Sequence, residues 1–354
     1  MNLNSKIFNK KKKIPLNVFI NECLYNLKHG FYMKQNPIGL NGDFITSPKI
    51  SILFSEMIAI WCISFWKQMG CPKKINILEI GPGDGALSSG LIKTFSKFDQ
   101  FNNSYSLNLL EKSKYLIKIQ KKKLNCNKVK WISSISNLTN DPVIIIANEF
   151  FDALPIKQFI YRNQKWFERY VEIDKLNKIK FLDIETKLPD FKKICKIDIA
   201  KNQKFIEFSL PIVNYIKAVS KIINKNNGGL ICFDYGYTQN KMFSSLQSVK
   251  KHRGSHILSD PGNQDITHLV NFTFLEKLSK QYKLDTEKII TQGKFLKTMG
   301  IIERANTLSK TKNFKEKADI YYRLKRLVHP NEMGDLFKVF FLKKKGNKFN
   351  LGFA

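Results

Sequence analysis

A glycine-rich turn between an apolar segment and a helical one constrains this fold more than any other feature. Residues 75–80 are mostly apolar and predict a buried strand, and the turn 81–85 (GPGDG) joins it to a segment with helical periodicity. Glycines let a ligand approach the backbone, and the free N–H groups of a helix N-terminus suit a nucleotide-like ligand. The sequence therefore predicts a cofactor cradle here.

Further apolar strands alternate with helical segments along the chain. Helices are expected at 14–30, 49–69, 212–224 and 268–282, and an antiparallel hairpin is expected from 159–172 and 179–186. The expected strands are 75–80, 106–111, 129–132, 143–147, 230–234, 284–290 and 336–342. Continuously apolar strands that alternate with helices indicate a parallel sheet covered on both faces, so we predict an α/β fold.

The charge balance is strongly basic but does not indicate a nucleic-acid partner. The net charge is +31, yet only six of the 60 basic residues are Arg, and the Lys residues are spread through the whole chain. Nucleic-acid sites favour Arg wherever geometry matters, and no helical segment carries a basic stripe with interleaved aromatics. We therefore expect no nucleic-acid partner, with a nucleic-acid acceptor kept as an alternative.

Compartment and metal content follow from what the sequence does not contain. The six cysteines form no C-x-x-C pair, and no carboxylate or cysteine completes a zinc site with His252 and His256, so no metal is expected. No apolar run approaches about 20 residues, so no membrane span is expected. The N-terminal segment has neither the apolar stretch of a signal peptide nor the Arg content of a typical transit peptide. We expect a soluble cytoplasmic protein.

Two acidic residues distinguish between the cofactors that the turn could bind. The turn alone fits both an S-adenosyl-L-methionine motif and a relaxed dinucleotide fingerprint. Glu79 lies two places before the first glycine, where it could bind an ammonium group that a dinucleotide lacks. Glu111 ends the second strand and could accept both ribose hydroxyls; alternatively it is a solvated acid at a helix start. Together they favour S-adenosyl-L-methionine.

The segment 148–155 (NEFFDALP) directly follows the fourth predicted strand. Ligands bind at the carboxyl ends of strands in such sheets, so its polar groups should face the reaction centre. Two carboxylates, Glu149 and Asp152, could bind and orient a planar guanidinium. Methyl transfer needs an acceptor nitrogen about 3 Å away and aligned, which positioning can supply. Alternatively, Glu149 caps and Asp152 begins the next helix.

A third polar cluster, 252–268, contains proline and glycine among acidic residues and predicts a shaped loop. We interpret this loop as one that gates or orients the acceptor, and His268 as a candidate catalytic residue within it. The alternative is that residues 265–268 simply cap the helix that follows.

Taken together, these ordered motifs resemble the MidA family of class I methyltransferases, whose mitochondrial members are protein arginine methyltransferases acting in respiratory complex I assembly. The resemblance covers nearly the whole chain. The motifs that carry it are 42–48 (GDFITSP), 79–85 (EIGPGDG), 148–155 (NEFFDALP), 166–169 (WFER), 234–236 (DYG), 260–268 (DPGNQDITH) with Val270 and Phe272, 291–293 (TQG) and 333–339 (MGDLFKV).

The resemblance implies a class I methyltransferase with a Rossmann-like seven-stranded sheet, a helical N-terminal segment and inserted elements. Residues 1–74 would close over the cofactor, and 75–346 would form the core, with insertions at about 155–205, 236–267 and 293–330. The implied contacts to S-adenosyl-L-methionine come from the 42–48 segment, the turn and the two strand ends that follow it: Thr46, Ser47, Glu79, Gly81, Gly83, Gly85, Glu111 and Asn148.

The resemblance also implies a protein arginine as the acceptor, specifically on the 49-kDa-type subunit of complex I. Two positions depart from the family pattern: Asp84 stands where a basic residue is frequent, and Lys112 replaces a proline. The missing transit segment fits a bacterial member. The sequence leaves open a small-molecule acceptor, a non-catalytic assembly chaperone and, more distantly, a dehydrogenase; oligomeric state and the modified arginine are not encoded in any motif.

Overall fold

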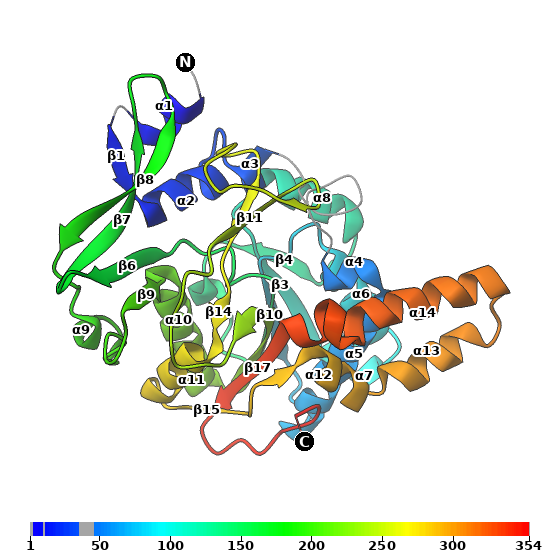
Figure 1. Cartoon of the computed structure of the whole chain (residues 1–354). Coiled ribbons are helices and arrows are strands. Elements are labelled where there is room, and N and C mark those ends of the chain that lie inside the picture. Colours follow the sequence, from blue (N-terminus) through cyan, green and yellow to red (C-terminus); the bar gives the residue numbers. More distant parts are fainter. Residues whose placement is uncertain (1–2, 10, 35–45, 354) are drawn as a thin grey trace.

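The computed structural model describes residues 3–9, 11–34 and 46–353. Of the 42–48 segment that we expect to close over the cofactor, residues 42–45 lie outside these ranges. Figure 1 shows a central sheet flanked by helices, with a second sheet beside the N-terminus. Within the described ranges, no helix combines the length and hydropathy needed to cross a bilayer.

The central sheet confirms the α/β class and the Rossmann-like arrangement. Its strands follow the order β15-β17-β10-β5-β2-β3-β4, and the short strands β14 and β16 pair with β10 and β17. The five strands from β4 to β10 are parallel, whereas β17 is antiparallel to β10 and β15. The bounds are β2 Ile75–Ile80, β3 Tyr105–Leu110, β4 Val129–Ile132, β5 Val143–Asn148, β10 Gly228–Tyr237, β14 Val270–Asn271, β15 Leu284–Thr286, β16 Ile290–Thr291 and β17 Phe337–Lys344. The single strand expected at 284–290 is wrong, because β15 and β16 are separate.

Helices cover both faces of this sheet, which explains why its strands are apolar throughout. Along β5, Ile144 and Ile146 join one hydrophobic cluster, and Ile145 joins the other. The first cluster includes residues of α5 Ile52–Gln68, α6 Ala86–Phe95, α7 Asp99–Ser104, α12 Gln292–Thr298, α13 Ile301–Ser309 and α14 Phe314–Val328. The second includes residues of α9 Phe191–Cys195, α10 Leu210–Asn226 and α11 Phe272–Gln281. Two short helical segments also contribute: Ile135 of η1 Ile135–Asn137 belongs to the second cluster, and Met333 of η2 Pro330–Gly334 belongs to the first. The helix α8 Lys114–Lys123 lies between β3 and β4 in the chain.

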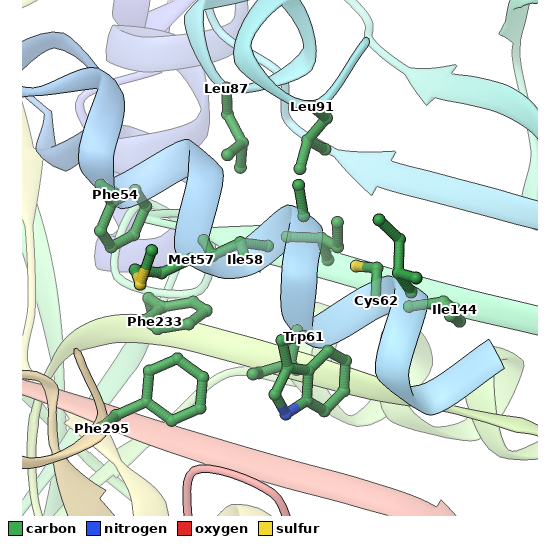
Figure 2. Close-up of a cluster of buried hydrophobic side chains, with 14 of the residues drawn as sticks. Phe54, Met57, Ile58, Trp61, Cys62, Leu87, Leu91, Ile144, Phe233 and Phe295 are labelled. Atoms are coloured by element: carbon green, nitrogen blue, oxygen red, sulfur yellow. The ribbon is translucent and has the colours of Figure 1, made fainter. Parts of the chain in front are cut away.

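The long helix α5 forms the centre of the first cluster (Figure 2). Its Phe54 makes an edge contact with Phe233 of β10 at 5.2 Å between ring centroids, and Phe233 in turn contacts Phe295 of α12 at 5.3 Å. All three rings are fully buried. The carboxyl end of β10 is therefore anchored in a close-packed aromatic core.

A second, five-stranded sheet forms from two parts of the chain that are far apart in sequence. Of the hairpin expected from 159–172 and 179–186, the second strand is present as β8, but the single first strand is wrong, because a turn at Asn163 and Gln164 divides it into β6 and β7. β9 and the N-terminal β1 extend the sheet. The bounds are β1 Lys13–Pro15, β6 Lys157–Arg162, β7 Lys165–Ile173, β8 Ile179–Thr186 and β9 Phe205–Phe208. A third, small sheet contains β11 Gln247–Lys250, β12 Arg253–Gly254 and β13 Asp265–Thr267. Residues of the N-terminal helices and of β7, β8 and β13 share one hydrophobic cluster.

Two helices predicted near the N-terminus have different bounds in the structure. The helix expected at 14–30 is wrong at both ends, because residues 13–15 pair with β7 and α2 spans only Leu16–Tyr25. α1 Leu3–Phe8 precedes it and α3 Phe31–Lys34 follows. The helix expected at 49–69 is two helices, α4 Ser47–Ile50 and α5. Ser51 separates them in an extended conformation, and its hydroxyl caps α5 by accepting from the N–H of Leu53.

Candidate active site

A cavity of about 680 Å³ lies at the carboxyl ends of β2, β3 and β5. Its wall contains residues 81–84, 111–113 and 148–150, which follow these strands directly. Residues of α2, α3, α6, α8 and α10, together with Thr46, also line the cavity. The three strand ends that the sequence singles out therefore meet at one hollow, as the position of ligand sites in parallel sheets predicts.

The three glycines of the turn adopt left-handed backbone angles that other residues rarely take. The φ angle is 68° at Gly81, 54° at Gly83 and 78° at Gly85. A Cβ at Gly81 would lie 2.7 Å from a ring carbon of Phe150 and would collide with it. Gly81 and Gly83 lie on the cavity wall, whereas Gly85 is the N-cap of α6. The turn thus presents backbone groups to the cavity.

Glu79 of β2 lies on the cavity wall and is 3% exposed. The hydroxyl of Ser88, in α6, donates a hydrogen bond to its carboxylate. Burial raises the pKa of Glu79 to about 7. The group can therefore be ionised near neutral pH, and an ammonium group in the cavity would favour that form.

Glu111 follows β3 and is held in place by two hydrogen bonds. Its Oε1 accepts from the N–H of Ser113 at 2.7 Å, and its Oε2 accepts from Nε2 of Gln120 at 3.3 Å. The same Nε2 donates to the carbonyl of Gly83 at 2.7 Å, and Oε1 of Gln120 accepts from Trp131 Nε1 at 2.8 Å. Burial raises the pKa of Glu111. Gln120 therefore links the predicted ribose acid to the glycine turn.

Asp84, the departure from the family pattern in the turn, is neutralised by two lysines. Nζ of Lys49 in α4 and Nζ of Lys123 in α8 each lie 2.8 Å from its Oδ2. Burial acts to raise the pKa of Asp84, but the two lysines outweigh it and hold the pKa below its usual value. The Lys49 bridge also ties the short helix α4 to the glycine turn.

Asn148 and Glu149 place polar groups on the wall at the end of β5. Glu149 has a φ of 51°, which is rare for a residue with a Cβ, and its N–H donates to the carbonyl of Phe233 at 2.8 Å. Its Oε1 accepts from the N–H of Ser47 and from Nδ2 of Asn148, both at 3.1 Å. Burial raises the pKa of Glu149 to about 8.

Thr46 and Ser47 belong to the part of the 42–48 segment that the structure describes, and they lie beside the Glu149 carboxylate. Thr46 is the N-cap residue of α4 and lies on the cavity wall. Ser47 is fully buried, and its hydroxyl donates to Oε1 of Gln292 in α12 at 3.3 Å. Of the two, Thr46 faces the cavity, while the backbone of Ser47 holds the Glu149 carboxylate.

Asp152 lies behind Glu149 and is not among the described residues that line the cavity. It is 5% exposed, and its Oδ1 has no hydrogen-bond partner among the described residues. Burial raises its pKa well above the usual value, and the nearby carboxylates of Asp234, Asp265 and Glu149 raise it further. The structure therefore gathers four acids at this end of the sheet, of which Glu149 reaches the cavity.

His268 is buried and bonded to the backbone. Its Nδ1 lies 3.2 Å from the carbonyl oxygen of Leu269, and its Nε2 lies 3.2 Å from that of Leu154. Its own N–H donates to the carbonyl of Asp152 at 3.0 Å. Burial lowers the pKa of His268. The ring thus connects the loop before α11 to the segment after β5, and it is absent from the described cavity wall.

Several further residues that no sequence motif singles out line the cavity. Tyr25 of α2 and Tyr32 of α3 line the cavity; their hydroxyls donate to the carbonyl of Ala153 at 2.9 Å and to Oδ1 of Asp265 at 2.8 Å. Residues 133–136 also line it, directly after β4. The rule that ligands bind at strand ends could have identified 133–136, whereas no local pattern identifies the two tyrosines.

The chemistry of the wall fits S-adenosyl-L-methionine. Glu79, Glu111 and Glu149 supply carboxylates for a ligand that carries an ammonium group, a ribose diol and a sulfonium. Oδ1 of Asn148 is buried without a partner among the described residues, so it remains available to accept a hydrogen bond from a ligand. Among the described residues, no three or more His, Cys, Asp or Glu side chains are arranged so that they could hold a metal ion.

Comparisons with known proteins agree with this fit. A family model described as "Putative S-adenosyl-L-methionine-dependent methyltransferase" matches residues 57–290. The chain is 30% identical to the Xenopus laevis protein arginine methyltransferase NDUFAF7, mitochondrial, over 96% of this chain and 83% of that protein. It is 29% identical to the Danio rerio protein of the same name, over 92% and 83%. A solved structure from Burkholderia thailandensis, bound to S-adenosyl-homocysteine, has a TM-score of 0.83 at 21% identity and covers 99% of this chain and 92% of that one.

Proposed function

Because this chain belongs to the MidA family of S-adenosyl-L-methionine-dependent methyltransferases, we propose that it methylates arginine side chains of a protein. One observation carries the choice of arginine. The carboxylate of Glu149 lies on the wall of the cofactor cavity, and its described partners are the N–H of Ser47 and the amide of Asn148. A positively charged acceptor is the group that such a buried acid would bind most strongly.

Glu149 would orient the acceptor through the geometry of the guanidinium group. A guanidinium presents its N–H donors in a fixed planar fork, so a carboxylate that accepts from it also sets the direction of the remaining nitrogen. Bound S-adenosyl-L-methionine supplies an electrophilic methyl group. Behind Glu149, Asp234 has a pKa of about 7 because it is buried, so its ionised fraction adds negative potential around the guanidinium and helps to stabilise its charge.

Glu149 can also take the proton that methylation releases. A methylated guanidinium nitrogen carries one proton more than the product needs, and a base with a pKa near the working pH removes it most effectively. The pKa of Glu149 is about 8 because of burial, which fits this role. Release of the proton to solvent then returns the carboxylate to its ionised form.

We extend the proposal to the 49-kDa-type subunit of respiratory complex I as the acceptor. The support is the resemblance of the whole chain to a family that acts in complex I assembly, together with relatives named protein arginine methyltransferase. The acceptor would approach the cavity between the tyrosines of α2 and α3 and the segment after β5, where the acids lie.

Mass spectrometry of that subunit tests the proposal. We expect arginine methylation on the subunit from cells with the protein, none from cells without it, and restoration by the wild-type chain but not by Glu149→Gln. Glu185→Gln, an exposed acid of β8, is the matched control and should restore methylation. Unchanged methylation without the protein would overturn the choice of subunit.

Two further measurements distinguish the alternative functions. If a labelled methyl group passed from S-adenosyl-L-methionine to small molecules or nucleic acid, and not to protein arginine, the acceptor would belong to that other class.

Calorimetry with S-adenosyl-L-methionine addresses the chaperone alternative. We expect saturable binding that weakens when Gly81 is replaced by Val, because a Cβ there collides with Phe150. Absence of S-adenosyl-L-methionine binding would instead support the non-catalytic chaperone.

A further inference from the structure

We infer that Asp234 is a positioning residue whose buried carboxylate holds the loop after β5 so that Glu149 stays on the cavity wall. The use of Glu149 in methyl transfer rests on the proposed function, whereas its positioning by Asp234 does not. Asp234 lies near the carboxyl end of β10, is fully buried, and is absent from the described cavity wall.

The carboxylate of Asp234 accepts four backbone N–H groups. Its Oδ1 accepts from the N–H of Tyr235 at 3.0 Å. Its Oδ2 accepts from three consecutive residues of the loop, Phe150 at 3.2 Å, Phe151 at 2.8 Å and Asp152 at 3.4 Å. Burial raises the pKa of Asp234 to about 7, and these four hydrogen bonds act against that rise. Hydrogen bonds to an ionised acceptor are stronger than those between neutral groups, so the set holds the loop backbone most firmly where Asp234 is ionised.

Glu149 needs such a restraint because of its backbone conformation. Its φ of 51° is sparsely populated for a residue with a Cβ and persists only where the surroundings enforce it. The N–H of Glu149 donates to the carbonyl of Phe233, and the next three N–H groups donate to Asp234. Two consecutive residues of β10 therefore hold the chain on both sides of the strained position.

The base of this arrangement is itself rigid. Phe233 lies between Phe54 and Phe295 in the aromatic core, as Figure 2 shows, and is fully buried. Phe233 also pairs with Asn148 across the parallel strands β10 and β5. Movement of Asp234 would disturb this packing, so the position of its carboxylate relative to β5 is well defined.

Asp234 also contributes negative charge beside Glu149. The titratable groups around Glu149 are Asp152 from its own loop, Asp234 and Tyr235 from β10, and Asp265 from β13. Burial raises the pKa of Glu149, and the charge of Asp234 raises it further, against the hydrogen bond from Ser47. Removal of that charge should therefore lower the pKa of Glu149, an effect that a purely structural role would not produce.

Hydrogen exchange with and without the ligand S-adenosyl-homocysteine tests the positioning directly. In Asp234→Asn, an amide nitrogen replaces one acceptor oxygen, and we expect the amides of 150–152 to exchange at least about tenfold faster than in the wild type. The amides of β2 should keep their protection, which shows that the chain has folded. Asp183→Asn, an isosteric change in β8 at an acid paired with Arg169, is the matched control and should leave 150–152 unchanged. Unchanged exchange in Asp234→Asn would overturn the inference.

Kinetics then separate positioning from general support of the fold. With a labelled methyl group and an arginine-containing protein acceptor, we expect kcat of Asp234→Asn to fall at least about tenfold while the KM for S-adenosyl-L-methionine stays nearly constant. The acidic limb of its pH profile should move to lower pH. Equal losses in kcat and cofactor affinity with an unmoved limb would indicate a structural role only. If the wild type methylates no arginine, the proposed function fails, and the exchange result still decides the positioning.

Discussion

Asp84 in the glycine turn and Asp152 after β5 are equally buried, at 5% exposure each, yet their surroundings are opposite. Two lysines contact Asp84 and hold its pKa low. Around Asp152 the neighbouring charged groups are acids, and its pKa is raised. Burial alone therefore does not determine whether an acid is ionised; the charges that the fold brings to it do.

The difference indicates different roles for the two regions. The chain has 60 basic residues, so a shortage of basic side chains does not explain why lysines contact only one of the two acids. In the glycine turn, the ion pairs neutralise the charge of Asp84 and connect α4 and α8 through it. At the end of β5, Glu149 and Asp152 have no positively charged partner among the ion pairs of the described residues, which suits a cationic substrate that arrives from outside.

The largest expected effect comes from removing the acid that reaches the cavity. Glu149→Gln should reduce kcat for methylation of an arginine-containing protein by about 100-fold or more, because the charge and the proton acceptor are both lost. Binding of S-adenosyl-homocysteine by calorimetry should stay close to wild type. Glu185→Gln is the control, and a Glu149→Gln enzyme with nearly full activity would contradict the role of this acid.

Removal of the paired acid should act on stability. Asp84→Asn removes the anion that Lys49 and Lys123 both contact, and we expect the free energy of unfolding in urea to fall by about 2 kcal/mol at pH 7. Because the pKa of Asp84 is lowered on folding, its contribution is present above its unfolded pKa and is lost as pH falls through the folded pKa. The difference between variant and wild type should therefore disappear in acid. A constant difference would show that the ion pairs are not its cause.

The pH dependence of activity reports the ionisation of Glu149. Glu149 must be ionised to bind a guanidinium, and its pKa is about 8. We expect kcat/KM for the protein acceptor to rise about tenfold between pH 7 and pH 9, as the ionised fraction of such a group rises. The rise should be absent in Glu149→Gln, measured over the same range. A flat profile in the wild type would mean that Glu149 is already ionised at pH 7.

The smallest expected effect is a gain in stability. Because folding raises the pKa of Asp152, its contribution to stability is present below the unfolded pKa and is lost as pH rises through the folded pKa. Asp152→Asn should thus raise the free energy of unfolding by about 1 kcal/mol at pH 8 and change it little at about pH 4, close to the unfolded pKa. Urea unfolding at both pH values measures this. A loss as large as that of Asp84→Asn would remove the distinction between the two regions.

Much of the fold was predictable because its signals are local. The strands 75–80 and 143–147 are apolar over their full length, and such runs alternate with helices, which indicates a covered parallel sheet. The same order places Glu79, Glu111 and Glu149 at strand ends, and the structure puts all three on one cavity wall. The helix predicted at 14–30 failed because β1 pairs with β7, about 155 residues away in the chain, and no local pattern reports such pairing.

The sequence by itself determined which residues could form the site: the glycines of the turn and the acids after the strands. Only the tertiary structure decided what each acid does. Lys49 and Lys123 reach Asp84 from separate helices, Ser47 reaches Glu149, and Asp234 holds the loop from β10. Ionisation and orientation depend on distances between groups, and folding alone brings these distant groups within hydrogen-bonding range.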